Sequence, residues 1–217
     1  SEAGWKEIRM SKVQSCGDQA VRTIVLGSAS PRRRELVQLL GLDIPVRIEA
    51  SDANESVPPG LRPAEAAEWL ALRKASSVRE RLGDEAAGAV IIGADTIVVL
   101  DGEMLGKPKD AADACRMLGL LQGRAHEVIT GVAVVEGASG RSKTAGSVTR
   151  VFMKTLDAER IGRYVATGEP LDKAGAYGIQ GLAAGFVERI EGCYFNVVGL
   201  PVSLLGDLLA EFGVRTI

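Results

Sequence analysis

The chain has 217 residues, of which 46% are hydrophobic and 25% charged, with 26 basic and 28 acidic side chains. These proportions are typical of a soluble globular protein, and the length suffices for one domain or two closely joined lobes. A net charge of −2 and 4% aromatic residues argue against a protein that binds nucleic acid through a broad positive surface or a base-stacking groove. His126 is the single histidine, which excludes mechanisms that need two.

Two further features concern location. No apolar run approaches the roughly 18 residues that cross a bilayer, and residues 1–19 lack the uninterrupted apolar stretch of a secretory signal. The cysteines, Cys16, Cys115 and Cys193, are widely spaced and match neither a disulfide framework nor a zinc pattern. We therefore expect a cytoplasmic protein with no membrane partner.

After a polar extension over residues 1–21, the hydrophobic pattern alternates between strands and helices. In chain order it predicts a strand over 23–26, a helix over 31–40, a strand over 44–48, a loop over 51–63 and a long helix over 64–82. It continues with a strand over 89–100, a turn at Asp101-Gly102, a helix over 110–121, strands over 127–135 and 147–153, and a helix over 157–167.

Residues 168–181 are too rich in glycine for regular structure. A second hairpin is predicted from strands 186–190 and 194–198, which flank Glu191-Gly192, and a helix over 201–212 follows. Strands that alternate with helices, together with hairpins, predict an α/β fold with a mixed sheet.

A first candidate site lies where the strand over 23–26 leads into a helix, at Ser28-Ala29-Ser30-Pro31-Arg32-Arg33. Ser30 is a favourable N-cap and Pro31 suits the first helical position, and such a helix start attracts anions. At about 100° per residue, Arg32 and Arg33 lean toward the body of the fold, whereas Arg34 points away. The pattern favours a phosphate-binding turn, with a solvated basic helix start as the alternative.

Two charged residues interrupt apolar patterns. Lys74 lies in the apolar stripe of the helix over 64–82, where its ammonium must either reach solvent or meet a negative charge. Asp95 lies in the apolar strand over 89–100, where a carboxylate must be paired, hydrogen-bonded or bound to a metal. Asp95 is a candidate Mg²⁺ ligand or base for a water nucleophile, or else ties down a turn. Lys107 lies close enough in the sequence to reach the same site as Asp95. The alternative is that it is a surface lysine.

The glycine-rich segment over 168–181 suits a loop that approaches a ligand closely, although a flexible surface loop has the same composition. Within it, Gln180 offers both a donor and an acceptor to the edge of a base. Nothing marks His126 as a ligand or a base, so we expect it to be structural.

Four separated motifs now form a pattern: Ser28-Ala29-Ser30-Pro31-Arg32-Arg33, Gly93-Ala94-Asp95-Thr96, Gly106-Lys107-Pro108 and the segment 172–181. Together they resemble the Maf family of nucleoside triphosphate pyrophosphatases, also described as septum-formation inhibitors. The likeness runs in order from about Thr23 to Phe212.

The resemblance implies a domain over 22–217 with an elongated mixed sheet flanked by helices and two lobes around a central cleft, similar to inosine triphosphate pyrophosphatases. It implies hydrolysis of a nucleoside triphosphate to the monophosphate and pyrophosphate with a divalent metal, Mg²⁺ or Mn²⁺. It also implies a homodimer and a role in cleansing the nucleotide pool of modified pyrimidines.

Roles of single residues follow from the same resemblance. Arg32, Thr96 and Gln180 match the branch that prefers dTTP and UTP, whereas the branch acting on 7-methyl-GTP usually has glutamate in place of Gln180. Thr96 and Gln180 would select the base. The triphosphate would be neutralised by Ser28, Arg32, Arg33, Lys74 and Lys107, with Lys173 in the same cleft.

Asp95, together with Glu55, would hold the metal and orient or deprotonate the attacking water. The sequence departs from the family pattern at Gly27, where alanine is usual, and at Asn54, where an acid is common. Two other interpretations stay open: a non-catalytic nucleotide-binding regulator of cell division, and a nucleic-acid module built on Arg32–Arg34, although three arginines supply little affinity.

Overall fold

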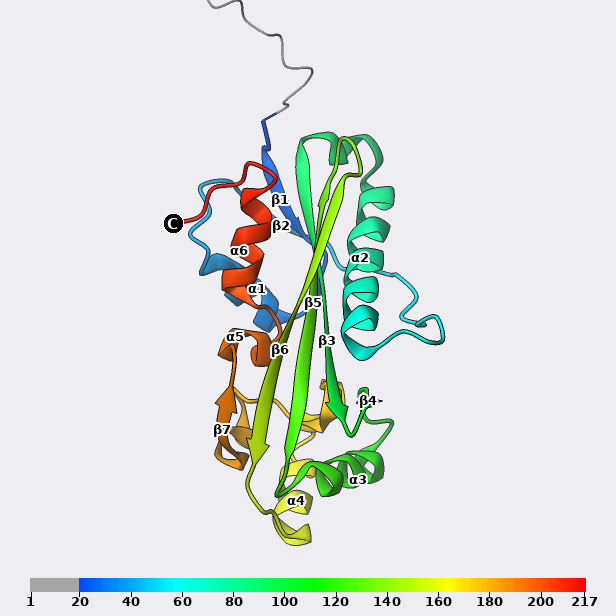
Figure 1. Cartoon of the computed structure of the whole chain (residues 1–217), viewed down its shortest axis with the longest axis vertical. Coiled ribbons are helices and arrows are strands. Elements are labelled where there is room, and N and C mark those ends of the chain that lie inside the picture. The colour runs from blue at the N-terminus through cyan, green and yellow to red at the C-terminus, as the bar shows by residue number, and fades with distance from the viewer. Residues whose placement is uncertain (1–19) are drawn as a thin grey trace, which may run out of the picture.

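A computed structural model describes residues 20–217, so the predicted extension lies outside the described residues except for its last two. The described chain forms a mixed, seven-stranded sheet in the order β2-β1-β3-β5-β6-β7, with β4 paired to β3. The sheet is long and narrow and carries helices on both faces (Figure 1). The predicted α/β class and the elongated mixed sheet are therefore confirmed. Over residues 20–217, no helix has the length and apolar character needed to cross a membrane.

Three long antiparallel strands form the spine of the molecule: β3 (Ala89–Leu100), β5 (Ala125–Glu136) and β6 (Ser142–Met153). The shorter strands complete the sheet: β1 (Thr23–Leu26) and β2 (Val46–Ile48) pair in parallel, β4 (Glu103–Leu105) turns back along β3, and β7 (Val187–Glu191) pairs with β6. The first hairpin turns as predicted, with Asp101 and Gly102 in the left-handed region at φ 50° and 79°.

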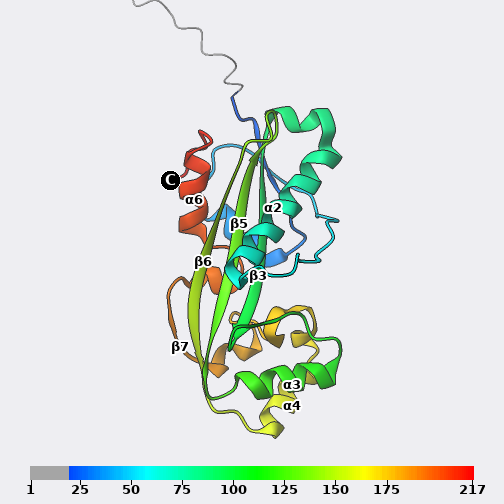
Figure 2. The same ribbon diagram turned by 45° about the vertical axis from the view of Figure 1, so that its right-hand side comes forward.

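The helices divide between the two faces and the lower end of the sheet (Figures 1 and 2). One face carries α2 (Pro63–Leu82), and the other carries α1 (Pro31–Gln38), α5 (Tyr194–Val198) and α6 (Val202–Ala210). The lower end carries α3 (Ala111–Leu121) and α4 (Ala158–Val165). Short 3₁₀ helices cover Gly83–Gly88, Glu169–Asp172, Ala174–Ala176 and Leu182–Phe186, so part of the predicted irregular segment is helical.

Buried side chains gather at both ends of the long strands. In the upper part, Ile91 packs beneath α2, whereas its neighbour Ile92 packs beneath α1 and α6 on the opposite face. In the lower part, a separate cluster that includes Leu118, Val128 and Tyr164 joins α3 and α4 to the sheet. The spine therefore carries two lobes, as the family resemblance implied.

Helix α2 lies against β3 and β5 with almost no space between the backbones. A Cβ atom at Gly93 would overlap the carbonyl oxygen of Ala71, and one at Gly131 would overlap the carbonyl of Ala67. Glycine is required at both strand positions because any side chain would push the helix away. This close contact fixes the height of α2 above the sheet.

The predicted second hairpin is wrong in one of its strands. Residues 187–191 do form β7, but Tyr194–Val198 is helix α5 instead of a returning strand. Its aromatic and β-branched residues gave a strand-like pattern, yet the segment folds back over the sheet, where the amide of Asn196 donates hydrogen bonds to Val128 O and Thr149 Oγ1. Tertiary contacts thus override the local β propensity.

The contact between α2 and β5 predicts the effect of a single methyl group. Gly131→Ala should lower the free energy of unfolding by about 2 kcal/mol or more, because the new methyl group meets backbone atoms of α2 that cannot move alone. Urea unfolding measures this change. Gly162→Ala in α4 is the matched control: its Cβ would meet no atom within 4 Å, and alanine should stabilise that helix slightly. Equal stability of the Gly131→Ala variant and the wild type would contradict the close packing.

Candidate functional site

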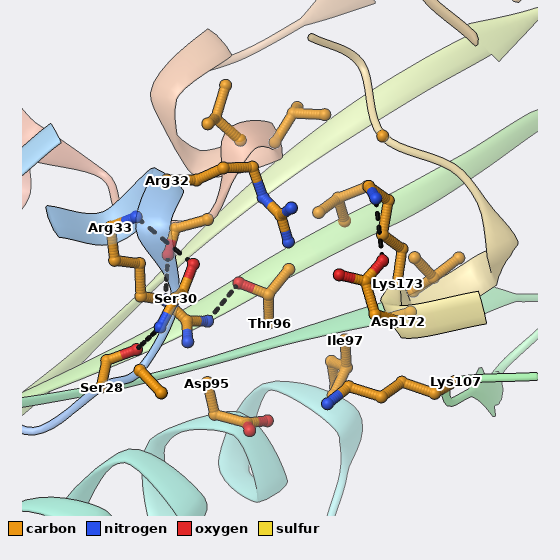
Figure 3. A pocket seen from close by; sticks show the side chains of 18 of the residues that line it. Ser28, Ser30, Arg32, Arg33, Asp95, Thr96, Ile97, Lys107, Asp172 and Lys173 are labelled. Atoms are coloured by element: carbon orange, nitrogen blue, oxygen red, sulfur yellow. Dashed lines mark hydrogen bonds and ion pairs between the residues drawn. The ribbon is translucent and has the colours of Figure 1, made fainter. Parts of the chain in front are cut away.

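A cleft of about 600 Å³ opens at the middle of the sheet, between the two lobes (Figure 3). Its position follows from the strand pairing of β3. Strand β1 accompanies β3 only as far as Ile92, and β4 joins it only from Val98. Between these points one edge of β3 is free of a neighbouring strand, so side chains on both of its faces reach the same cleft.

The cleft gathers every residue that the sequence proposed for the site. All of them line it: Ser28, Arg32, Arg33, Glu55, Lys74, Asp95, Thr96, Lys107, Lys173 and Gln180. Five lining side chains are cationic and three are acidic, the third acid being Asp172. The positive excess is local, in a chain whose net charge is −2. Such a cleft suits a small, highly charged anion.

The turn before α1 is shaped by two serine side chains (Figure 3). Ser30 caps the helix, its Oγ accepting a hydrogen bond from the Arg33 N–H at 3.4 Å, and Ser28 Oγ accepts one from the Ser30 N–H at 3.2 Å. Arg32 and Arg33 are half-buried and line the cleft, whereas Arg34 is exposed. The prediction from helical phase is confirmed.

Arg33 is fixed in the wall of the cleft. Its Nε donates to the Gly199 carbonyl at 2.7 Å, and its Nη2 donates to Thr96 Oγ1 at 3.0 Å. Burial lowers the pKa of the Arg33 guanidinium from its ordinary value, and the charge of Asp95 opposes this shift. An arginine remains protonated even so. Arg33 therefore supplies a positive charge whose position is set before any ligand binds.

Lys74 meets negative charge, the second of the two outcomes that its place in the helix allowed. Its Nζ lies 2.6 Å from Asp95 Oδ1 and 3.3 Å from Glu55 Oε1. The side chains of Lys74 and Asp95 are only 14% and 12% exposed, whereas Glu55 is 63% exposed. Two carboxylates on one ammonium group must lie close to each other, one fixed on the sheet and one on an open loop.

This donor set is compatible with a divalent metal. Over residues 20–217, no group of three or more histidine, cysteine or acidic residues is placed to hold an ion alone. Mg²⁺, however, is commonly bound through one or two carboxylates, with phosphate oxygens and water completing its shell. Asp95 and Glu55 supply two carboxylates beside a cationic cleft, so they fit an ion that binds together with a phosphate ligand.

The loop over 172–180 closes the far side of the cleft and is held by its backbone. Gly175 and Ala176 both adopt left-handed conformations, at φ 70° and 64°, and the Gly175 N–H donates to the Gly106 carbonyl at 3.1 Å. This bond ties the loop to the segment that carries Lys107. Both Lys107 and Gln180 are exposed at the rim of the cleft.

A buried pair anchors the same loop from below. The Tyr177 hydroxyl lies 2.6 Å from His126 Nε2, on strand β5. Burial lowers the pKa of His126 to about 4 and raises that of Tyr177, so both groups are neutral near pH 7. His126 therefore has the structural role that the sequence suggested.

Lys173 is held differently from the other cations of the cleft. Its Nζ donates to Asp172 Oδ1 at 2.8 Å and to the Glu169 carbonyl at 2.9 Å. The hydrogen bond from Lys173 keeps the pKa of Asp172 below its usual value. Sequence reasoning gave Asp172 no role, although its place beside a candidate lysine was a usable signal.

Comparisons with known proteins find similar sequences over most of the chain. A protein named dTTP/UTP pyrophosphatase from Pelotomaculum thermopropionicum is 52% identical over 91% of this chain and 100% of its own length. One of the same name from Moorella thermoacetica is 53% identical over 88% of this chain and 95% of its own.

A crystal structure described as nucleoside-triphosphatase / dITP/XTP pyrophosphatase from Mycobacterium abscessus aligns with 60% of this chain and 72% of its own. Its TM-score is 0.39 and its sequence identity is 19%. The profile of the family described as Maf-like protein matches residues 23–212. Since that match spans most of the chain, this protein belongs to the Maf-like family.

Proposed function

We propose that this chain hydrolyses nucleoside triphosphates, with dTTP and UTP as preferred substrates, to the monophosphate and pyrophosphate. The observation that carries the proposal is the convergence of five cationic side chains and the Asp95–Glu55 carboxylates on one cleft. The names of the relatives from Pelotomaculum and Moorella support the substrate class. We also propose a cytoplasmic location, from the spacing of the cysteines, and, from the resemblance to the family, a homodimer that cleanses the nucleotide pool of modified pyrimidines.

The triphosphate would lie along the turn from Ser28 to Arg33. Arg33 is already fixed there, and Arg32 lines the same wall. Lys107 and Lys173 face it from the other lobe (Figure 3). Phosphoryl-group chemistry depends mainly on positioning and on stabilisation of developing charge, and cations held by the protein supply both. The pyrophosphate leaving group gains negative charge as the reaction proceeds, so these cations favour its departure.

The reaction adds water at the α-phosphorus and breaks the bond from that phosphorus to the oxygen that bridges to the β-phosphate. Asp95 is the candidate acceptor of the water's proton. Its carboxylate is fixed on the sheet, and the hydrogen bond from Lys74 engages its Oδ1 atom. Asp95 and Glu55 are equally the candidate ligands of Mg²⁺ or Mn²⁺. When bound, such an ion neutralises phosphate charge and orients water. Lys74 would contribute a positive charge between the carboxylates and the phosphates.

The base would be read by Thr96 and Gln180, which line the cleft on β3 and on the loop over 172–180. Uracil and thymine present carbonyl oxygens and an imino N–H along one edge. An amide side chain satisfies both kinds of group.

A panel of triphosphates tests the proposed function. With Mg²⁺, dTTP and UTP should yield equal amounts of monophosphate and pyrophosphate, measured by anion-exchange chromatography. Other 5-methylated pyrimidine triphosphates should be cleaved in the same way. If 7-methyl-GTP is by far the best substrate, the assignment of Gln180 and Thr96 is wrong. If dTTP binds in calorimetry and no triphosphate is cleaved, the protein is a nucleotide-binding regulator and not an enzyme.

Asp95→Asn should lower kcat for dTTP about a hundredfold or more, because the amide neither accepts the water's proton nor binds a cation well. Circular dichroism should show a folded protein, since asparagine has the same shape and can accept a hydrogen bond from Lys74. Asp207→Asn is the matched control: it removes the same charge from an exposed position on α6, outside the cleft, and should leave kcat unchanged. A near-wild-type rate for Asp95→Asn would remove Asp95 from the mechanism.

A further inference from the structure

A row of hydrogen-bonded hydroxyl groups lies directly beneath the cleft. Thr96 on β3 and Thr130 on β5 are register partners, and their Oγ1 atoms lie 2.8 Å apart. Thr130 Oγ1 lies 3.0 Å from the main-chain carbonyl oxygen of Asn196 in α5. At the other end of the row, Arg33 Nη2 lies 3.0 Å from Thr96 Oγ1. Thr130 and Asn196 are completely buried, whereas Thr96 lines the cleft.

The chemistry of the two ends fixes the direction of every bond in this row. A carbonyl oxygen can only accept, so Thr130 donates its single hydroxyl proton to Asn196. Thr130 then has no proton for Thr96, and Thr96 must be the donor between the two threonines. A guanidinium can only donate, so Thr96 accepts from Arg33.

The hydroxyl of Thr96 is thereby left able only to accept a further hydrogen bond. Its proton is used by Thr130, and one of its two lone pairs is used by Arg33. A ligand that approaches Thr96 finds an acceptor only. An isolated threonine would instead rotate its proton toward whichever atom faces it.

Helix α5 holds the far end of the row in place. The amide of Asn196 donates to Val128 O at 3.1 Å and to Thr149 Oγ1 at 2.8 Å, and Thr149 in turn donates to Cys193 O at 3.2 Å. These bonds pin the first turn of α5 to β5 and β6. The bond to Val128 alone, which does not involve Thr149, holds Asn196 against β5, the strand that carries Thr130.

We propose that Thr130, held by Asn196, is a positioning residue that makes Thr96 a permanent hydrogen-bond acceptor, so that the cleft favours a pyrimidine that carries a hydrogen on N3. Uracil and thymine carry this hydrogen, whereas cytosine presents a lone pair at the same atom. Two acceptors facing each other leave both without a partner, which is costly in a buried site. The inference rests on the proposed function, because it concerns the choice among triphosphates that the cleft cleaves.

Thr130→Val tests the inference, because valine keeps the shape of threonine and removes the hydroxyl. The ratio of kcat/KM for dTTP to that for dCTP should fall about tenfold or more, since the proton of Thr96 is then free to turn toward cytosine. A loss of folded protein lowers both values equally and leaves their ratio unchanged. Thr130→Ser keeps the hydroxyl and should keep the ratio of the wild type.

Thr149→Val provides the matched comparison. It removes another completely buried hydroxyl that binds α5 but leaves the bond from Thr130 to Asn196, so the ratio should stay near that of the wild type. An unchanged ratio in Thr130→Val would overturn the inference, as would an equal fall in Thr149→Val, which would indicate general loosening of α5. Failure of the proposed function is a separate result: the wild type would then cleave neither dTTP nor dCTP.

Discussion

The close packing of helix α2 on strands β3 and β5 is the constraint on which the site depends. Gly93 and Gly131 let the helix lie against the sheet with no side chain between them. At that height a lysine of the helix reaches a carboxylate of the strand, and Lys74 pairs with Asp95 at 2.6 Å. Both charges are largely withdrawn from water, and each offsets part of the cost of burying the other. The pair then has one open side, which faces the cleft.

The interrupted edge of β3 turns this pair into part of a larger site. Successive residues of a strand point to opposite faces, so Asp95 meets α2 while Thr96 meets Arg33 of α1. Because neither β1 nor β4 covers the strand between Ile92 and Val98, both side chains still line one cleft. The two lobes then add charges from each side, on the turn before α1 and on the loop over 172–180. The proposed phosphate chemistry and the proposed base reading thus fall on adjacent residues, Asp95 and Thr96.

Local patterns predicted much of this arrangement. The spacing of apolar residues located the long strands and helices, and helical phase correctly turned Arg32 and Arg33 inward and left Arg34 exposed. The isolated charge of Asp95 in an apolar strand required a partner, and the structure supplies Lys74. Such predictions succeed because each depends on neighbours within a few residues along the chain.

Thr130 and Asn196, beneath the cleft, could not be predicted from the sequence, because their contacts join segments that are far apart in the chain. The hydroxyl row joins Thr96, Thr130 and Asn196, which come together only through the register of β3 with β5 and the fold of α5. The β-branched and aromatic side chains of residues 194–198 favoured a strand, so Asn196 was expected on a hairpin. In the structure its amide is buried against β5 and β6, and the segment forms helix α5.

The position of the attacked phosphorus is the central claim of this account. A single turnover of dTTP in water enriched in oxygen-18, followed by mass spectrometry of both products, tests it most directly. Attack at the α-phosphorus places the heavy oxygen in dTMP and leaves pyrophosphate unlabelled, which is the result that the account predicts. Label in pyrophosphate, or the release of dTDP and phosphate, would contradict it.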